Sequence, residues 1–290
     1  MAGSSALLRR TLKVASAAAD RWRPDLAGVV VLLYHRVGGG SALEIDLDAA
    51  RFEDQVAAVA ATGRAVPLAG ALEQLAAVSA PAEPSSVVVT FDDGTADFVD
   101  VALPILVRHQ VPATLYVATD FVEHGLPFPG GGRAISWSAL RDACSTGLVD
   151  IGSHTHTHRL LDRTPPAEAA DELDRSIDLI GARLDRVAHD FAYPKAVPGS
   201  PEVVQLVRQR FRSAALAGTR INPYRTANPR TEHPRTANHL RGTDPHRLAR
   251  SPIQVSDGMQ FFERKLAGGM ALEDSFRRAV NRVRYARAGT

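Results

Sequence analysis

The sequence is poor in cysteine, aromatic residues and net charge, and the first and last of these limit the class of protein. Cys144 is its only cysteine, so no intrachain disulfide is possible and nothing demands an oxidising compartment. Aromatic residues make up 6%, and 34 basic against 32 acidic residues leave a net charge of +2. That charge is too small to indicate nucleic-acid binding. With 45% hydrophobic residues in 290, the composition is typical of a globular protein with a sizeable core.

Long hydrophobic runs are also missing. Residues 27–34 are far shorter than the roughly 20 that span a bilayer. Residues 14–19 fall short of the roughly 7 to 15 apolar residues of a secretory signal, because Asp20 and Arg21 interrupt the run. We therefore expect no transmembrane span, a loose or amphipathic segment over 1–27, and a location in the cytoplasm or at the membrane surface. A secreted or cell-envelope protein is the alternative.

Short β-branched runs alternate with helical patterns along most of the chain. The sequence predicts strands at 29–34, 87–91, 113–117, 149–152, 189–193 and 213–217, and helices at 49–61, 97–109, 136–146, 166–184, 201–210 and from Met259 to Leu266. Such alternation favours βα units around a parallel sheet, and six or seven units fit an α/β barrel.

One stretch departs from this alternation. From Arg225 the chain reads RTANP, RTEHP, RTANH, a near-repeat whose prolines exclude a regular helix, so we expect a surface loop near 222–246. The wider stretch 208–250 holds ten arginines and two acids. It is either a solvated loop or a basic surface suited to a phosphate-linked sugar. Residues 266–290 are expected to form a basic C-terminal helix and tail.

Reactive polar residues recur immediately after the apolar strands. His35 follows VVVLLY, Asp92 and Asp93 follow VVVTF, His154 follows VDIGS, and Tyr193 follows HDFA. In a parallel barrel the carboxyl ends of all strands meet at one rim, where such enzymes keep their active sites. Four segments distant in sequence are therefore expected to converge on one pocket.

The acids and histidines in this set suit a metal site. Asp92 and Asp93 precede Gly94, which is also favourable turn chemistry, but two histidines and one carboxylate make a three-ligand site with an open position. If residues 154–158 were extended, all three histidines would share a face, whereas a turn into a helix would pair His154 with His158. Gly152 before the run favours the turn. Zinc is the first choice of metal, and nickel, cobalt or iron suit the same donors.

Three motifs carry a resemblance to a family. TFDDG at 90–94, SHTHTH at 153–158 and FAYPK at 191–195 resemble the successive motifs of the polysaccharide deacetylases, the carbohydrate esterase family 4 or NodB-homology domain. The FAYP form is similar to the poly-N-acetylglucosamine deacetylase branch. Over residues 28–265 the resemblance implies a distorted, circularly permuted (β/α) barrel of about seven units. It also implies a metal-dependent hydrolase that removes acetyl groups from N-acetylated sugars, acting on carbon–nitrogen bonds other than peptide bonds.

The same resemblance implies roles for the strand-end residues. Asp92 matches the general base of the family, and Asp93 matches the metal ligand that His154 and His158 join. His156 falls at the variable middle position, where it would lie behind the ligands or face solvent. By alignment on the proline of FAYPK, the backbone NH of Lys195 would hold the oxyanion and Tyr193 would shape the pocket wall.

Two family residues have no counterpart at their usual places. The arginine near the base is missing from the third motif, and Arg250 is either its replacement or an exposed loop residue. The C-terminal histidine that supplies the general acid is also missing. LLYHRV at 32–37 resembles an N-terminal segment of the poly-N-acetylglucosamine branch, which makes His35 the candidate acid. Trp137 is expected either to stack on a sugar ring or to pack at the start of a helix.

The expected substrate is an acetylated amino sugar, polymeric, lipid-linked or nucleotide-linked, and no nucleic-acid partner is expected. A catalytically impaired carbohydrate-binding barrel and an O-acetyl esterase acting on a glycan are the alternatives. A zincin-like hydrolase is disfavoured, because Thr155 stands where the zincin motif has glutamate after the first histidine.

Overall fold

The computed structural model describes residues 2–22, 26–77, 85–225 and 242–276. The five-residue repeat at 226–241 and the tail after 276 lie outside the described residues. Within them, the flanks of the predicted loop form β9 (Asn222–Pro223) and the 3-10 turn η6 (Pro245–Arg247). The division of the chain into three segments at residues 27 and 265 stays a prediction.

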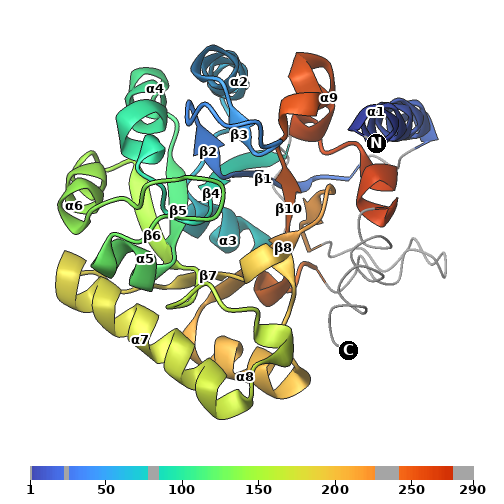
Figure 1. The fold of residues 1–290 in the computed structure, drawn as a ribbon. Helices are drawn as coiled ribbons and strands as arrows, with labels where there is room; N and C mark the ends of the chain where they lie inside the picture. Colours follow the sequence, from blue (N-terminus) through green and yellow to red (C-terminus); the bar gives the residue numbers. More distant parts are fainter. Residues whose placement is uncertain (1, 23–25, 78–84, 226–241, 277–290) are drawn as a thin grey trace.

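Seven parallel strands close into a barrel, so the predicted α/β barrel is confirmed (Figure 1). In spatial order they are β1 (Gly28–Tyr34), β4 (Ser86–Phe91), β5 (Ala113–Val117), β6 (Val149–Ser153), β7 (Asp190–Ala192), β8 (Ser213–Ala217) and β10 (Leu248–Pro252). The ring closes where β10 pairs with β1, with Leu32 opposite Ser251. Strand β9 adds an antiparallel edge to β1, and β2 (Arg36–Val37) pairs with β3 (Asp46–Leu47).

The sequence predicted six of the seven barrel strands and missed β10. Its residues, LARSP, adjoin the arginine-rich loop and contain no run of β-branched side chains. Four of the five are nevertheless buried, because β10 lies between β8 and β1.

Helices surround the barrel wall in Figure 1. They are α2 (Ala49–Ala61), the π-helical turn η2 (Phe98–Ala102) with α4 (Leu103–His109), α6 (Trp137–Ser145), α7 (Pro166–Leu184), α8 (Pro201–Arg210) and α9 (Gly258–Leu266). Most of these match the sequence prediction within one or two residues. Three helices were not predicted: α1 (Ala2–Ala19), α3 (Leu68–Ala76) and α5 (Thr119–His124). Short 3-10 turns occur at Asp20–Trp22, Leu161–Arg163, Pro194–Ala196 and Val255–Asp257, named η1, η3, η4 and η7.

Alternation along the strands separates two apolar cores. In β1, Val30 and Leu32 belong to the outer core with Phe52 of α2, whereas Val29 and Val31 belong to an inner core with Leu68 of α3. Successive strand side chains point to opposite faces, so every second residue points into the barrel. Because α3 covers the amino ends of the strands with apolar residues, the opposite end is left for polar groups.

An aromatic cluster fixes α2 and η2 against the first two barrel strands. The rings of Tyr34, Phe52, Phe91 and Phe98 are fully buried and meet at centroid distances of 4.9 to 5.8 Å. Each buried aromatic side chain contributes about 1.5 to 3 kcal/mol. The cluster therefore braces β1 and β4 directly beneath the strand ends that carry His35 and the two acids.

The described part of the N-terminal segment is helical, so of the two expectations the loose segment is wrong and the amphipathic one is left. Residues 2–19 form α1, whose Lys13 and Ser16 are buried against the C-terminal part of the chain. Among the helices that the structure describes, none has the length and apolar character needed to cross a membrane.

Candidate active site

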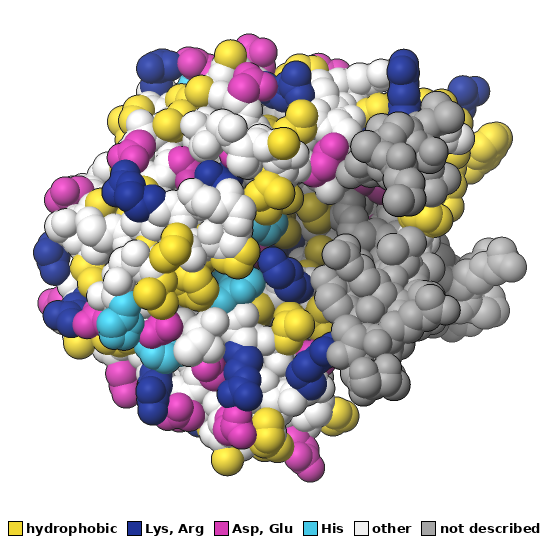
Figure 2. Space-filling model, in the orientation of Figure 1, with side chains coloured by type: hydrophobic (Ala, Val, Ile, Leu, Met, Phe, Trp, Pro, Cys, Tyr) yellow, Lys and Arg dark blue, Asp and Glu magenta, His cyan; other side chains and the backbone are white. Residues whose placement is uncertain are grey.

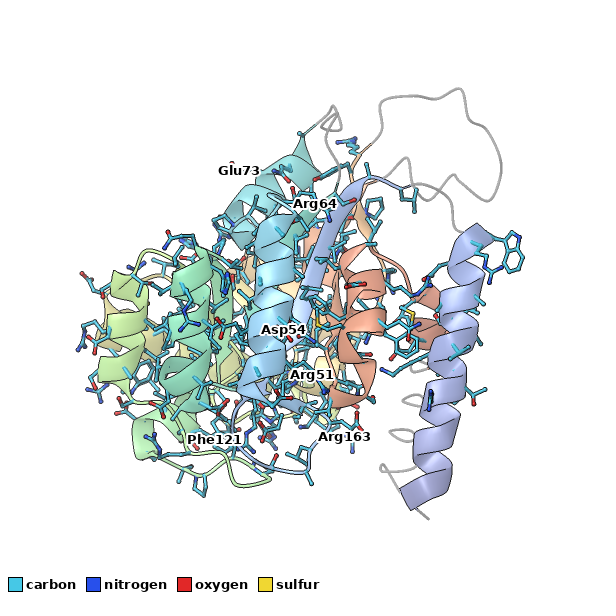
Figure 3. All side chains as sticks on the ribbon, turned by 90° about the horizontal axis from the view of Figure 1, so that it is seen from above. Arg51, Asp54, Arg64, Glu73, Phe121 and Arg163 are labelled. Atoms are coloured by element: carbon cyan, nitrogen blue, oxygen red, sulfur yellow. The ribbon has the colours of Figure 1, made fainter. Side chains whose placement is uncertain are left out.

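The carboxyl ends of the barrel strands meet in one polar pocket. Its lining residues are Leu33, His35, Asp92, Asp93, His154, His158, Lys195, Ala196, Ala217 and Pro252. Figure 2 looks onto this end, where histidine and basic side chains lie in a central hollow. In Figure 3, Phe121 and Arg163 mark the pocket end, and Arg64 and Glu73 mark the opposite end. The predicted convergence of four segments is thus what the fold produces.

Asp92 points into the barrel and is held by Arg250. The Nη1 and Nη2 groups of Arg250 donate to the two carboxylate oxygens of Asp92 at 2.6 and 2.8 Å, and Nη1 also lies 3.3 Å from the hydroxyl of Thr90. Arg250 is completely buried, so its interpretation as an exposed loop residue is wrong. The other interpretation, a partner for the acid, matches the geometry, because β10 places position 250 inside the ring.

The arginine decides the ionisation state of Asp92. Burial alone raises the pKa of Asp92, but the charges of Arg250 and His154 and the bonds from Arg250 outweigh it. The net pKa is therefore below the ordinary value of 3.8. A buried charge needs such a partner, because its desolvation is otherwise too costly. Asp92 is thus a carboxylate at neutral pH.

A tyrosine and a glycine hold Arg250 in place. The guanidinium carbon lies 5.2 Å from the centre of the Tyr116 ring, within the range of a cation–π contact. The ring occupies space left by Gly152 on the next strand, where a Cβ atom would lie 2.5 Å from Tyr116 Cδ1. Gly152 therefore allows the tyrosine, and the tyrosine supports the arginine.

Asp93, His154 and His158 form a group suited to a metal ion. Asp93 Oδ1 lies 3.6 Å from Nε2 of His154 and 3.3 Å from Nε2 of His158, and one ligand atom from each residue lies within 4.8 Å of the others. Asp93 reaches this position because its φ is 75°, in the turn that continues through Gly94. Two imidazoles and a carboxylate are a donor set for zinc or a related divalent ion.

The protonation states of these groups fit metal binding. Nδ1 of His154 donates to the carbonyl of Ala192 at 2.7 Å, which leaves Nε2 with a free lone pair facing Asp93. Burial lowers the pKa of His154 to about 4, so the ring is neutral at pH 7. Burial raises the pKa of Asp93, but the bond from His158 and the neighbouring histidine charges outweigh it and hold that carboxyl below its usual range.

The loop that carries the histidines is fastened on two sides. The backbone NH groups of Thr119 and Asp120, at the start of α5, donate to the carbonyls of Thr155 and His156 at 3.3 and 2.9 Å. On the other side, both the NH and the hydroxyl of Thr157 donate to the carboxylate of Glu172 on α7, at 2.8 and 2.6 Å. The loop therefore presents His158 without forming a regular element of its own.

The predicted turn brings His154 and His158 together, but the expected helix does not follow it. Thr155 and His158 have positive φ angles of 66° and 59°, which no helix accommodates. The turn η3 begins at Leu161 and α7 begins at Pro166. Sequence reasoning also missed Glu172, since one acid on an amphipathic helix carries no local signal that it will be buried.

His156 stands outside the metal group. Its Nδ1 shares a hydrogen bond with the Thr119 hydroxyl at 3.0 Å, and its Nε2 lies 3.6 Å from Oδ1 of Asp120. The ring therefore faces α5 instead of Asp93. This placement agrees with its expected position behind the ligands.

His35 follows β1 directly and lines the same pocket as Asp92 and Asp93. A positive charge on His35 lowers the pKa of both acids. Its Nδ1 is buried and has no hydrogen-bond partner among the described residues. An unpartnered buried ring nitrogen at a pocket wall is one mark of a functional site.

Three other predicted residues divide between the pocket and the core. Lys195 lines the pocket, in a turn with a φ of 54° directly after Pro194. Tyr193 does not, because its ring is buried outside the barrel against Phe191 at 4.9 Å. Trp137 begins α6 and donates from Nε1 to Glu123 at 2.7 Å, away from the pocket lining. Its interpretation as a helix-start residue therefore fits, and stacking on a sugar in this pocket does not.

The resemblance that the three motifs predicted is confirmed by a family comparison. Residues 79–209 match the family model described as polysaccharide deacetylase. The matched stretch runs from the approach to β4 into α8 and contains Asp92, Asp93, the histidine loop and Lys195. This part of the chain is thus similar to the polysaccharide deacetylase family. His35 and Arg250 lie outside the match, so their place in the site rests on geometry. No curated protein matches the sequence.

Solved structures share the fold at low identity. The Streptococcus pyogenes deacetylase PplD is 20% identical with a TM-score of 0.65, over 83% of this chain and 99% of that one. IcaB from Ammonifex degensii is 23% identical with a TM-score of 0.65, over 82% and 97%. A polysaccharide deacetylase from Bacillus cereus is 20% identical with a TM-score of 0.64, over 83% and 69%. These matches support the barrel fold.

Proposed function

We propose that the chain is a metal-dependent carbohydrate N-deacetylase, which hydrolyses the acetamido group of an amino sugar to acetate and a free amine. One observation carries the proposal. The ionised Asp92, fixed by Arg250, lies in the same pocket as the Asp93, His154 and His158 group and as His35. Base, metal ligands and acid are the parts that hydrolysis of an unactivated amide requires.

Asp92 is the general base. Its carboxylate is ionised at neutral pH and takes the proton from the water that attacks the acetyl carbonyl. The two bonds from Arg250 fix the carboxylate plane, so the base does not need to reorient as the proton moves. They also weaken its basicity, because they favour the charged form. So weak a base can take a proton from the attacking water only if that water is more acidic than bulk water.

Asp93, His154 and His158 would hold the divalent ion. Bound there, the ion supplies a Lewis acid for the acetyl oxygen and lowers the pKa of water from 15.7 towards about 7. We propose zinc first, with nickel, cobalt and iron as the other ions to test. The backbone NH of Lys195 is proposed as a further donor to the oxyanion, since its turn lines the same pocket.

His35 is the proposed general acid. An amine leaves an amide only after it is protonated, so the leaving nitrogen needs a proton donor in the pocket. The half-buried His35, at the end of β1, meets that need. Its presence supports amide over ester hydrolysis, and it disfavours the interpretation as an impaired binding barrel.

The proposed substrate is an N-acetylated amino sugar. The relative PplD was solved with acetate, the product expected of this chain. A nucleotide-linked or lipid-linked sugar would place the reaction in the cytoplasm or at the membrane surface, and a polymer would place it in the cell envelope.

The test is acetate release by the purified chain, loaded in turn with zinc, nickel or cobalt, from free, nucleotide-linked, lipid-linked and polymeric N-acetylated sugars. We expect release from at least one class, and release by Asp92→Asn that is lower by about a hundredfold or more. Release from O-acetylated glycans alone would replace the proposal by an esterase. Sugar binding without any release would replace it by the binding barrel.

A further inference from the structure

One face of the molecule reverses the usual arrangement of polar and apolar side chains. It is formed by α1, the turn η1 and the helical residues 271–276, and we call it the terminal face. Among the described side chains, nine large hydrophobic ones are exposed, and four lie here: Val14 at 55%, Trp22 at 81%, Leu272 at 47% and Phe276 at 42%. The segments adjoin, because the backbone NH of Glu273 donates to the hydroxyl of Ser16 on α1. Exposed apolar side chains on adjoining segments of this kind mark an interaction surface.

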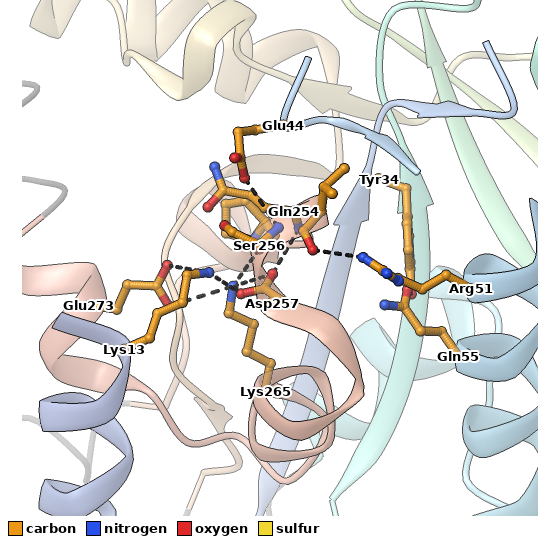
Figure 4. Close-up of polar contacts among 12 residues, drawn as sticks. Lys13, Tyr34, Glu44, Arg51, Gln55, Gln254, Ser256, Asp257, Lys265 and Glu273 are labelled. Atoms are coloured by element: carbon orange, nitrogen blue, oxygen red, sulfur yellow. Dashed lines mark hydrogen bonds and ion pairs between the residues drawn. The ribbon is translucent and has the colours of Figure 1, made fainter. Parts of the chain in front are cut away.

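The charges of the same segments point inward. Lys13 of α1 is 2% exposed and pairs with the buried Asp257, and it lies 3.6 Å from Glu273 (Figure 4). Lys265 of α9 lies 2.8 Å from Asp257 and 3.5 Å from Glu273, which completes a buried cluster of two cations and two acids. The cluster attaches α1 firmly to the barrel. The apolar residues outside are thus part of a fixed surface.

Asp274 turns inward as well, where it receives a bond from Arg220 at 2.8 Å. Residues 271–276 therefore bury both of their acids and expose Leu272 and Phe276, one helical turn apart. A surface helix of a globular protein usually buries its apolar residues and exposes its charged ones. Such an inversion is expected where another apolar surface covers the exposed side of these residues.

The exposed charges on the described part of these segments are basic. Arg10 and Arg21 are exposed, whereas Asp20 is half-buried and Glu273 and Asp274 are buried. The outer side of the terminal face therefore combines apolar side chains with cations.

We propose that the terminal face docks on an anionic lipid surface, with Val14, Trp22, Leu272 and Phe276 in the interface and the arginines on the headgroups. Exposed apolar residues accompanied by exposed arginines fit such a surface, and tryptophan is favoured at its polar boundary. A second copy of the chain fits poorly, since face-to-face contact would bring the two basic surfaces together.

Docking in this way leaves the pocket open. In Figure 3, α1 runs along the side of the barrel, and the pocket lies at the end marked by Phe121 and Arg163. The cluster also reaches the pocket wall, because Lys265 donates to the carbonyl of Pro252 at 2.8 Å and Pro252 lines the pocket. The mouth would then keep a fixed direction relative to the lipid surface.

The test is co-sedimentation of the full chain with phosphatidylcholine vesicles, with and without phosphatidylglycerol. We expect binding to the anionic vesicles alone, a blue shift of Trp22 emission that is absent in Trp22→Phe, and weaker binding as salt rises. Trp22→Ser with Phe276→Ser should reduce binding at least tenfold. Arg10→Gln and Arg21→Gln should each cost roughly fivefold. All these positions are exposed, and an unchanged melting temperature verifies the fold.

Val187→Ser is the matched control, since Val187 is 66% exposed on the loop before β7, away from the terminal face, and its loss should leave binding unchanged. Equal binding of neutral and anionic vesicles, or of the double variant and the parent, would refute the proposal. Binding to heparin without a Trp22 shift would replace the lipid by a soluble polyanion. Concentration-dependent dimerisation abolished by the same double variant would replace it by a second copy. None of these readouts depends on turnover, so the result stands apart from the deacetylase assay.

Discussion

Arg250 donates to both carboxylate oxygens of Asp92 from a position 158 residues further along the chain. Water solvates neither charge, because Arg250 is fully buried and Asp92 is nearly so. The pair therefore does two things at once. It makes a buried charge tolerable, and it fixes the orientation of the proposed base.

Replacing Arg250 should affect both stability and pH dependence. Arg250→Met leaves the buried Asp92 unpaired, which should cost about 3 to 5 kcal/mol in denaturant unfolding. The pair now stabilises the fold above the ordinary pKa of 3.8, and that contribution is lost as pH falls through the lowered folded-state value. Without the guanidinium, burial raises the pKa of Asp92, so the acid limb of acetate release should move to higher pH. An unchanged acid limb would contradict the assignment of Asp92 as the base.

Asp92→Asn should separate chemistry from metal binding. The amide cannot accept a proton, so acetate release should fall by about 10²- to 10⁴-fold, the usual contribution of a general base. The metal ligands are untouched, so elemental analysis should find the parent's metal content. Near-normal turnover by this variant would exclude Asp92 as the base.

The three histidines of the loop should respond differently to substitution. His154→Ala and His158→Ala remove proposed ligands and should lower the bound metal measured by elemental analysis after dialysis. His156→Ala is the matched control, because its ring faces Thr119 and Asp120 and should leave the metal content unchanged. Equal loss in all three variants would show that the ligand set is wrong.

Glu172 should influence the metal without touching it. Its carboxylate holds Thr157, the residue before His158, so Glu172→Ala should weaken metal affinity by about 10- to 100-fold, as loss of a ligand's supporting group does. Glu172→Gln keeps one acceptor and should recover part of the affinity in a calorimetric titration. Asp178→Ala, at an exposed position of the same helix, is the control and should bind metal normally. If the Glu172 and Asp178 variants bind equally well, the loop does not need this clamp.

Two glycines should respond to alanine in opposite directions. At Gly152 a Cβ would lie 2.5 Å from the Tyr116 ring and 2.8 Å from the Asp190 carbonyl, so Gly152→Ala should destabilise the fold by about 1 to 3 kcal/mol. At Gly181, inside α7, the nearest atom would be 3.9 Å away, and Gly181→Ala should stabilise by about 0.5 to 1 kcal/mol. Thermal unfolding measures both. A tolerated Gly152→Ala would mean that Tyr116 moves freely.

Local sequence patterns predicted the parts of this fold that local physics determines. Runs such as Val87 to Val89 identify a buried strand, and the polar residues after each run identify the pocket end of the barrel. The spacing of His154 and His158 likewise predicted the turn that brings them together. In each case neighbouring residues in the chain supply the signal.

The missed parts depend on partners far away in the sequence. Arg250 resembles a loop arginine as long as the pairing of β10 with β8 and β1 is unknown. The residues around it carry no strand pattern that would predict this pairing. Tyr193 was expected in the pocket because it follows a strand, but the alternation of side chains along β7 turns it outward. Lys13 likewise resembles a residue of a loose terminus until Asp257 and Glu273 are placed beside it.

The closure of the barrel affects when, during folding, Asp92 gains its partner. β10 is the last barrel strand to be synthesised, and it joins the first. Until β10 pairs with β1, Asp92 has no guanidinium partner. In that state the charge of Asp92 is not compensated, and its carboxylate is not held in one orientation. A chain in which β10 has not yet paired with β1 therefore contains all three motifs but lacks the contact between Arg250 and Asp92.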